Sequence, residues 1–179
     1  MTEDERTERL HEIVRAHFDG VWKFLRRLGF DRDTADDATQ ELFLVVRRRL
    51  DEIHPERERA FLFGAAFRIA THLKRKRSRE VPTVQLGDDS ESDEGDTTPE
   101  ERLDDERARA LLYRLMSELD EAHRVVFVMF ELERMTMQEI ADTLDVPLGT
   151  VASRLRRARD DFRGRLERHR MRTRRGEST

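Results

Sequence analysis

The chain of 179 residues is 36% hydrophobic and 41% charged, which allows two small cores rather than one large core. It has no cysteine, which excludes disulfides and cysteine-ligated zinc and fits a cytoplasmic protein. The formal net charge of -4 is unevenly distributed: residues 87–106 hold eleven acids and one arginine, whereas residues 147–175 hold eleven arginines and three acids. A basic C-terminal part therefore keeps nucleic acid open as a ligand.

The composition also predicts the fold class. Only 8 Gly and 4 Pro are present, which favours long helices over short strands, so we predict an all-α protein. No apolar run approaches the roughly 20 residues of a membrane span, and the acidic N-terminus does not look like a signal peptide. We therefore expect no membrane insertion and no export.

Three helices are predicted in the first half of the chain. The first spans residues 10–28, and Gly29 follows at the position of a C-terminal cap. Its apolar stripe is predicted to be Leu10, Ile13, Val14, Phe18, Val21, Leu25 and Leu28. The second follows the capping residue Asp31 and continues to residue 53. The third covers residues 56–79 and ends in a basic run.

Residues 82–99 are acidic, lack periodicity and offer almost nothing to bury, which predicts a disordered linker. A chain of this kind spans roughly 5 to 6 Å times the square root of its length, and self-repulsion extends it further. We therefore predict two helical domains, residues 1–81 and 100–179, which the linker allows to lie tens of ångströms apart.

The second domain is predicted to contain helices over residues 100–118, 120–133 and 136–144 and a long helix from residue 150. Thr136 and Glu139 have the spacing of a capping box at the start of the short helix. The apolar spacing that follows is typical of a helix-turn-helix, in the residues Ile140, Ala141, Leu144, Val146 and Val151. Asp145, in the turn, tolerates a left-handed backbone.

The last helix separates apolar from polar residues. Its buried stripe is predicted to be Val151, Leu155, Ala158 and Phe162, with Ser153, Arg156 and Arg157 on the opposite side. Such a face suits the major groove, where arginine pairs with guanine. For any single arginine, the alternative is that the side chain is only exposed to solvent. The predicted DNA contacts are Thr150, Ser153, Arg154, Arg156, Arg157 and Arg159.

Three segments together resemble the extracytoplasmic-function (ECF) sigma factors of bacterial RNA polymerase. LMSELDEAHRVVFVMFELE and TMQEIADTLDVPLGTVASRLRRARDDFRGRL resemble the minus-35 reading domain of that sigma-70 family. HFDGVWKFLRRLGFDRDTADDATQELFLVVRRRLDEI resembles its polymerase-binding segment, and AFLFGAAFRIATHLKRKR its minus-10 segment. The resemblance implies promoter-specific transcription initiation, with core RNA polymerase, promoter DNA and an anti-sigma factor as partners. Phe61, Arg68, His72 and Ala152 depart from the usual pattern, which leaves the promoter sequence open.

The second helix carries an outward face that mixes apolar and acidic residues. The resemblance implies that this face binds the clamp coiled coil of the largest polymerase subunit, through Asp36, Asp37, Gln40, Glu41, Phe43 and Leu44. Without the resemblance, an ordinary solvated helix face would be the preferred interpretation.

The third helix places Phe63 and Phe67 one turn apart, on the face away from its main apolar stripe and just before the basic run. Aromatic rings beside cations suit unpaired bases, and the alternative is that both rings pack beneath the first helix. The predicted minus-10 contacts are Phe63, Phe67, Arg68, His72, Lys74, Arg75 and Arg77.

The sequence also bears on two other classes of function. The sequence has no Gly-rich phosphate loop, and its six histidines show no ligand spacing, so we expect no enzyme, no cofactor and no metal. Asp36, Asp37 and Glu41 are explained by the dipole at a helix N-terminus rather than by a metal. The serious alternative is a stand-alone helix-turn-helix regulator, which would bind duplex DNA by itself, often as a dimer.

Overall fold

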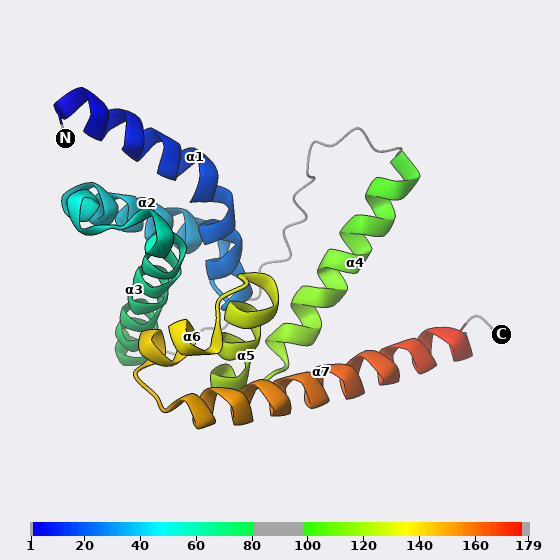
Figure 1. Cartoon of the computed structure of the whole chain (residues 1–179). Coiled ribbons are helices and arrows are strands. Elements are labelled where there is room, and N and C mark those ends of the chain that lie inside the picture. The colour runs from blue at the N-terminus through cyan, green and yellow to red at the C-terminus, as the bar shows by residue number, and fades with distance from the viewer. Residues whose placement is uncertain (1, 81–98, 177–179) are drawn as a thin grey trace.

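The computed structural model describes residues 2–80 and 99–176, with side chains described for residues 2–76 and 106–174. Within these ranges every regular element is helical, which confirms the predicted fold class (Figure 1). The first half contains α1 (Glu3–Arg27), α2 (Arg32–Arg49) and α3 (Glu58–Glu80), with short 3-10 turns at Leu50–Glu52 and Pro55–Arg57. The second half contains α4 (Pro99–Ser117), α5 (Glu121–Phe127), a π-helical turn (Val128–Leu132), α6 (Met137–Leu144) and α7 (Leu148–Gly176). No helix in the described ranges combines the length and apolarity needed to cross a membrane.

Helix α1 begins seven residues before the apolar stripe that predicted it, because a capping box precedes that stripe. The Thr2 hydroxyl accepts a hydrogen bond from the Glu5 backbone N–H, and the Glu5 carboxylate accepts one from the Thr2 backbone N–H. At the other end Gly29 has φ +94°, a left-handed conformation that favours glycine, as expected of a C-terminal cap. The core of this half is built on buried Phe24, Leu42 and Leu62.

The predicted helix over residues 120–133 is α5 followed by the π-helical turn. The turn inserts one extra residue, so that the Glu133 N–H donates to the Val128 carbonyl at 3.0 Å. Arg134 then adopts a left-handed backbone with φ 55°, and Met135 returns into the core. This irregular segment was not predicted, because apolar spacing does not distinguish a π turn from an α-helix.

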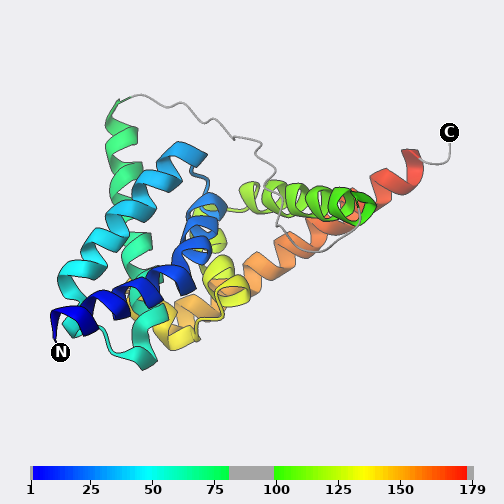
Figure 2. The same ribbon diagram turned by 90° about the horizontal axis from the view of Figure 1, so that it is seen from above.

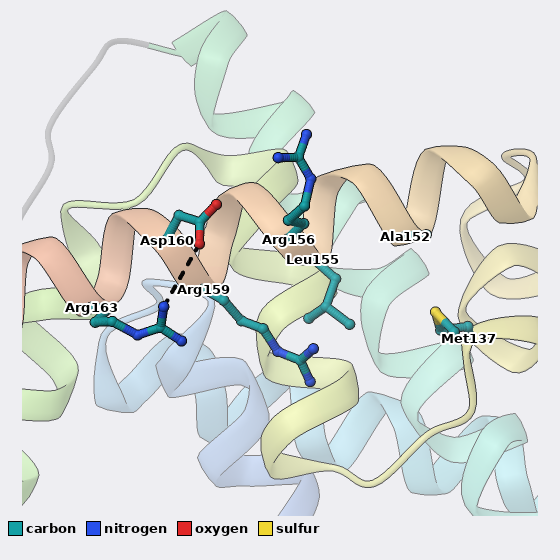
Figure 3. A pocket seen from close by; sticks show the side chains of 7 residues that line it. All are labelled: Met137, Ala152, Leu155, Arg156, Arg159, Asp160 and Arg163. Carbon is teal, nitrogen blue, oxygen red and sulfur yellow. Dashed lines mark ion pairs between the residues drawn. The ribbon is translucent and has the colours of Figure 1, made fainter.

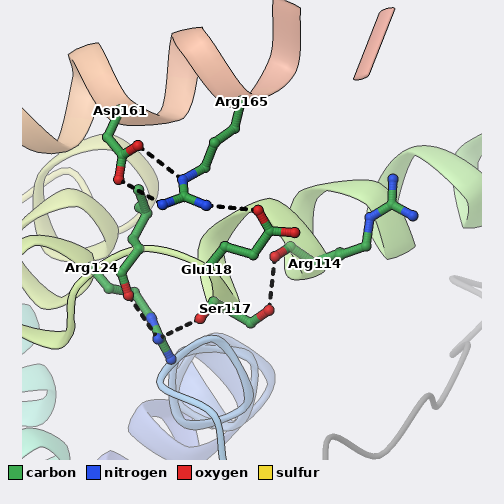
Figure 4. A network of polar contacts seen from close by, with 7 residues as sticks. Arg114, Ser117, Glu118, Arg124, Asp161 and Arg165 are labelled. Carbon is green, nitrogen blue, oxygen red and sulfur yellow. Dashed lines mark hydrogen bonds and ion pairs between the residues drawn. The ribbon is translucent and has the colours of Figure 1, made fainter. Parts of the chain in front are cut away.

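A polar network fastens the long α7 to the corner between α4 and α5 (Figure 4). The Arg165 guanidinium donates to Asp161 on its own helix at 2.9 Å and to Glu118 at 2.7 Å. Arg124 donates to the backbone carbonyls of Ser117 at 2.8 Å and Leu119 at 3.0 Å, which satisfies the end of α4. Glu118, outside the helix-turn-helix, thus helps to hold the direction of α7.

The two halves of the chain are packed against each other, with α6 against α3 and α4 against α1 (Figure 1, Figure 2). One buried apolar cluster continues from Phe24 and Phe63 into Val126 and Met129. The sequence predicted domains that could lie tens of ångströms apart, whereas this conformation has them in contact. The predicted linker lies outside the described residues except for Pro99, which begins α4.

Candidate nucleic-acid interface

The helix-turn-helix is built by α6, a tight turn and α7. The predicted capping box is present: the Glu139 N–H donates to the Thr136 hydroxyl at 3.2 Å, and the Thr136 N–H donates to the Glu139 carboxylate at 2.7 Å. Asp145 has φ 53° and ψ 51°, the left-handed backbone that the sequence allowed. The Val146 N–H then returns to the Ala141 carbonyl at 3.1 Å, so the turn closes over α6.

Helix α7 presents the two faces that the sequence predicted. Val151, Leu155 and Ala158 are buried. Phe162 stacks on Phe127 with 5.0 Å between the ring centroids. The opposite side carries Ser153, Arg156 and Arg157, all exposed. A rigid helix with an outward cationic face can enter a major groove without rearranging its own core.

The flanking predicted contacts are more constrained. The Arg159 Nε donates to the Glu131 carboxylate at 2.6 Å, and the guanidinium lies over the Phe130 ring at 5.2 Å. Arg154 and Thr150 are half-buried, and the Thr150 carbonyl accepts a hydrogen bond from the Ser153 hydroxyl at 3.0 Å. Thr150 therefore contributes through its backbone to the orientation of Ser153.

A hollow of about 260 Å³ lies beside this face of α7 (Figure 3). Met137, Ala152 and Leu155 supply its apolar lining, and Arg156, Arg159, Asp160 and Arg163 supply its polar lining. The Arg159 and Arg163 side chains extend to the same side of the helix, while Arg156 extends to the other (Figure 3). Arg163 is not among the predicted contacts, although it follows Arg159 by one helical turn and lines the same hollow.

The α3 candidates divide into buried and exposed residues. The prediction that the Phe63 ring faces away from the core is wrong: it is 2% exposed and packs edge-on against Phe24, with 5.2 Å between the ring centroids. Phe67 is half-buried, whereas Arg68, His72 and Arg75 are exposed. Phe63 thus follows the alternative interpretation, packing against α1. Periodicity alone did not show this, because α3 contacts α1, α2 and α6.

Two further α3 candidates are Lys74 and Arg77. The Lys74 Nζ lies 2.7 Å from a Glu121 carboxylate oxygen of the second half of the chain, and it sits over the Phe30 ring at 5.6 Å. The side chain of Arg77 lies outside the described residues, so its predicted role stays a prediction from sequence.

The outward face of α2 combines an apolar centre with a polar edge. Leu44 is 53% exposed, and half-buried Phe43 stacks on Phe18 of α1 with 5.9 Å between the ring centroids. Phe18 is 41% exposed, so it belongs to this surface rather than to the core stripe where the sequence placed it.

The polar candidates of α2 differ in their contacts. Asp37, Gln40 and Glu41 are exposed, so their side chains are available around the apolar centre. Asp36 instead accepts a hydrogen bond from the Trp22 indole N–H at 2.6 Å and ties α2 to α1. Among the described residues, no group of three or more histidine or acidic side chains is placed to hold a metal ion.

Comparison with known proteins places both halves of the chain in one family. The family model for sigma-70 region 2 matches residues 13–80, and the model for sigma-70 region 4 matches residues 109–161. The RNA polymerase sigma-E factor of Streptomyces avermitilis is 34% identical over 158 residues, which cover 87% of this chain and 84% of that protein. This chain belongs to the ECF sigma factors of the sigma-70 family.

Other relatives of this sigma factor support the same placement. The ECF RNA polymerase sigma factor SigE of Mycolicibacterium smegmatis is 31% identical over 88% of this chain, and the match spans 62% of the SigE length. A structure of the sigma factor RpoE with the anti-sigma factor NepR from Bartonella quintana has a TM-score of 0.71 at 17% identity, covering 93% of this chain and 98% of that one. CnrH, solved with the cytosolic domain of CnrY, has a TM-score of 0.64 at 23% identity, covering 90% and 89%. These two structures support the fold.

Proposed function

We propose that this ECF sigma factor directs promoter-specific initiation by core RNA polymerase. The observation that carries the proposal is the outward cationic face of α7, which a buried stripe and a closed turn hold rigidly in a chain that also has the region 2 domain. The polymerase supplies the chemistry of RNA synthesis, and the sigma factor supplies the choice of site. We assign it no catalytic role and no cofactor, and we place its action in the cytoplasm with the polymerase.

Helix α7 reads the minus-35 element in this proposal. Arg156 and Arg157 reach guanine edges in the major groove, and Ser153 lies beside them on the same exposed face. Arg159, Arg154 and the backbone around Thr150 position the helix against phosphates, which fixes its register without reading sequence. Arg163 adds a further phosphate contact at the edge of the hollow.

Helix α3 captures the minus-10 region. Its exposed cations bind phosphates, and the half-buried Phe67 stacks on an unpaired base once the duplex is melted. Phe63 supports this helix from the core, so we assign it a positioning role rather than a contact with DNA. The proposed contacts are Phe67, Arg68, His72, Lys74, Arg75 and Arg77.

The α2 surface docks on the polymerase. Exposed Leu44 and the Phe18–Phe43 stack provide an apolar centre of the kind found in protein interfaces, and Asp37, Gln40 and Glu41 provide a polar rim. Asp36 acts through Trp22 by holding α2 on α1. The clamp coiled coil of the largest subunit is the partner that family membership suggests. Because the RpoE neighbour was solved with an anti-sigma factor, we propose a partner of that class for this chain as well.

Reconstituted transcription tests the proposal against the stand-alone regulator. Purified chain and sigma-free core polymerase are combined on a genomic fragment library, and DNA binding by the chain alone is measured in parallel. Defined start sites that need both proteins support the sigma function. Specific duplex binding by the chain alone, without any directed initiation, would establish a stand-alone regulator instead.

A further inference from the structure

Glu133 is a carboxylate buried where the two halves of the chain meet. It is 3% exposed, and its Oε1 lies 2.7 Å from the Arg27 Nη1 at the end of α1. Its Oε2 lies 3.6 Å from the Arg59 Nη2 at the start of α3, and the Arg59 Nε donates to the Glu133 backbone carbonyl at 2.7 Å. Both cations come from the region 2 domain, whereas the acid comes from the region 4 domain.

The backbone around Glu133 is irregular in a way that serves this contact. The π-helical turn Val128–Leu132 ends immediately before it, and Arg134 immediately after it has φ 55°. A π turn and a left-handed residue other than glycine each cost free energy, and such features persist where the surroundings or a function maintain them. Here the two irregularities flank the residue that inserts between the arginines.

Two more contacts extend the interface over α3. The Lys74 ammonium lies 2.7 Å from a Glu121 oxygen. This cation, a proposed minus-10 contact, is therefore paired with an acid of the region 4 domain. A Cβ added at Gly64 would lie 3.5 Å from the Thr143 side chain of α6, so α6 approaches the α3 backbone closely. The face of α3 beside Arg68 and the first helix of the helix-turn-helix therefore meet directly.

This arrangement is incompatible with reading both promoter elements together. Elements named minus-35 and minus-10 are separated by about 25 base pairs, or about 85 Å of duplex at roughly 3.4 Å per base pair. In the structure, α6 of the minus-35 reader contacts α3 of the minus-10 reader. The domains must separate before each can reach its own element.

We propose that the free chain rests in a closed form, in which Glu133 is clasped by Arg27 and Arg59, and that this form must open before the promoter can be bound. The inference rests on the proposed function, since it concerns the same two readers. It adds that the chain inhibits itself through contacts between its own domains.

Attraction between Glu133 and the two arginines favours the clasp, whereas burial of the carboxylate opposes it. Burial raises the pKa of Glu133, because the loss of solvation outweighs the attraction of Arg27 and Arg59. A buried carboxylate left without one of its cations is strongly unfavourable, whereas a neutral amide in its place is tolerated. Arg27→Gln should therefore open the chain, and Glu133→Gln added to it should close the chain again.

A reversible lock tests whether the closed form is inactive. The chain has no cysteine, so Gly64→Cys with Thr143→Cys introduces one pair, at a separation that a disulfide can bridge. We expect the oxidised chain to lose at least about tenfold of its directed initiation with core polymerase and the reduced chain to recover it. Equal initiation by the oxidised and reduced forms would overturn the proposal.

Zero-length crosslinking tests the closed form in the chain without engineered cysteines. The sequence has three lysines, Lys23, Lys74 and Lys76, so a carbodiimide link between Lys74 and Glu121 is readily mapped. We expect Arg27→Gln to reduce this link roughly tenfold, Glu133→Gln alone to preserve it, and the double variant to restore it. Arg15→Gln, on the exposed part of α1, is the matched control.

The outcomes separate the two proposals. Absence of the link in the unmodified free chain, or a link that Arg27→Gln leaves unchanged, would show that this clasp does not hold the domains together. Failure of the proposed function appears differently, because the reduced cysteine pair and the unmodified chain would then both fail to direct initiation. A locked chain that is inactive and a reduced chain that is active support both proposals together.

Discussion

Helices α7 and α3 are the two proposed DNA readers, and they differ in how much of their polar surface the chain itself occupies. Within the described part of the chain, no hydrogen bond or ion pair engages the exposed Arg156 and Arg157 of α7. On α3, Lys74 is held by Glu121, and Phe63 is buried against Phe24. One reader is therefore ready to bind, whereas the other is partly covered.

The difference follows from what each helix packs against. Helix α7 buries a narrow stripe and leaves its opposite side to solvent, so its apolar and polar faces stay separate. Helix α3 contacts α1, α2 and α6, so an apolar residue away from its main stripe still finds a core. When a helix is packed on several sides, an aromatic residue away from its main apolar stripe can belong to the core and need not bind a ligand.

The largest expected effect tests the assignment of Phe63 to the core. Phe63→Ala removes a buried ring and leaves a cavity, so it should lower the free energy of unfolding by about 3–5 kcal/mol. Phe67→Ala, at a half-buried site on the same helix, should cost less than half as much. Denaturant unfolding of both variants measures the contrast, and equal losses would show that Phe63 has no special packing role.

The next effect tests the free face of α7. Arg156→Ala should weaken recognition of a minus-35 element by about 1–3 kcal/mol, because a bidentate contact with guanine is lost, while stability changes little at an exposed site. Competition between promoter variants in reconstituted transcription measures the loss. Arg15→Ala removes another exposed arginine, from α1, and should leave promoter choice intact. If Arg156→Ala weakened transcription equally from every promoter variant, Arg156 would contact phosphate and not read a base.

The turn that aims α7 can be tested by backbone chemistry alone. Asp145→Val forces a β-branched residue into a left-handed conformation, which should cost about 1–2 kcal/mol of stability. Asp145→Gly should be neutral or slightly stabilising, since glycine adopts this backbone freely. Thermal unfolding distinguishes the two, and a well-tolerated valine would contradict the observed turn.

The smallest effect concerns the clasp and its response to pH. Because the pKa of Glu133 is raised in the closed form and returns toward its ordinary value of 4.5 on opening, proton binding favours closure. The closed fraction should therefore rise as pH falls from the raised pKa toward 4.5, and Glu133→Gln should abolish this component. Small-angle scattering across that pH range measures the closed fraction. If the chain instead expanded as pH fell, and Glu133→Gln abolished that expansion, the predicted direction of the pH effect would be wrong.

Patterns in the sequence predicted the parts of the molecule that depend on local chemistry. The capping box at Thr136, the left-handed Asp145 and the buried stripe of α7 each follow from residue type and spacing, and the structure confirms them. The capping box at Thr2 carries the same signal and was overlooked, which moved the predicted start of α1.

The parts that depend on contacts between distant segments could not be predicted in the same way. The burial of Phe63 requires knowing that α3 is enclosed, and the position of Glu133 requires a π turn that leaves no mark in apolar periodicity. Contact between the domains was hidden for a similar reason, because an acidic, aperiodic segment separates them in sequence. The exposed side of Phe18 also depends on how α1 and α2 meet.

The central claim is that two readers in one chain address two separate elements of one promoter, with the polymerase holding them apart. Footprinting of the polymerase with this chain at a mapped start site tests it most directly. We predict separate protection of the minus-35 and minus-10 regions, with the minus-35 protection weakened by Arg156→Ala and the minus-10 protection retained. A single protected segment that the chain produces without polymerase would contradict the account.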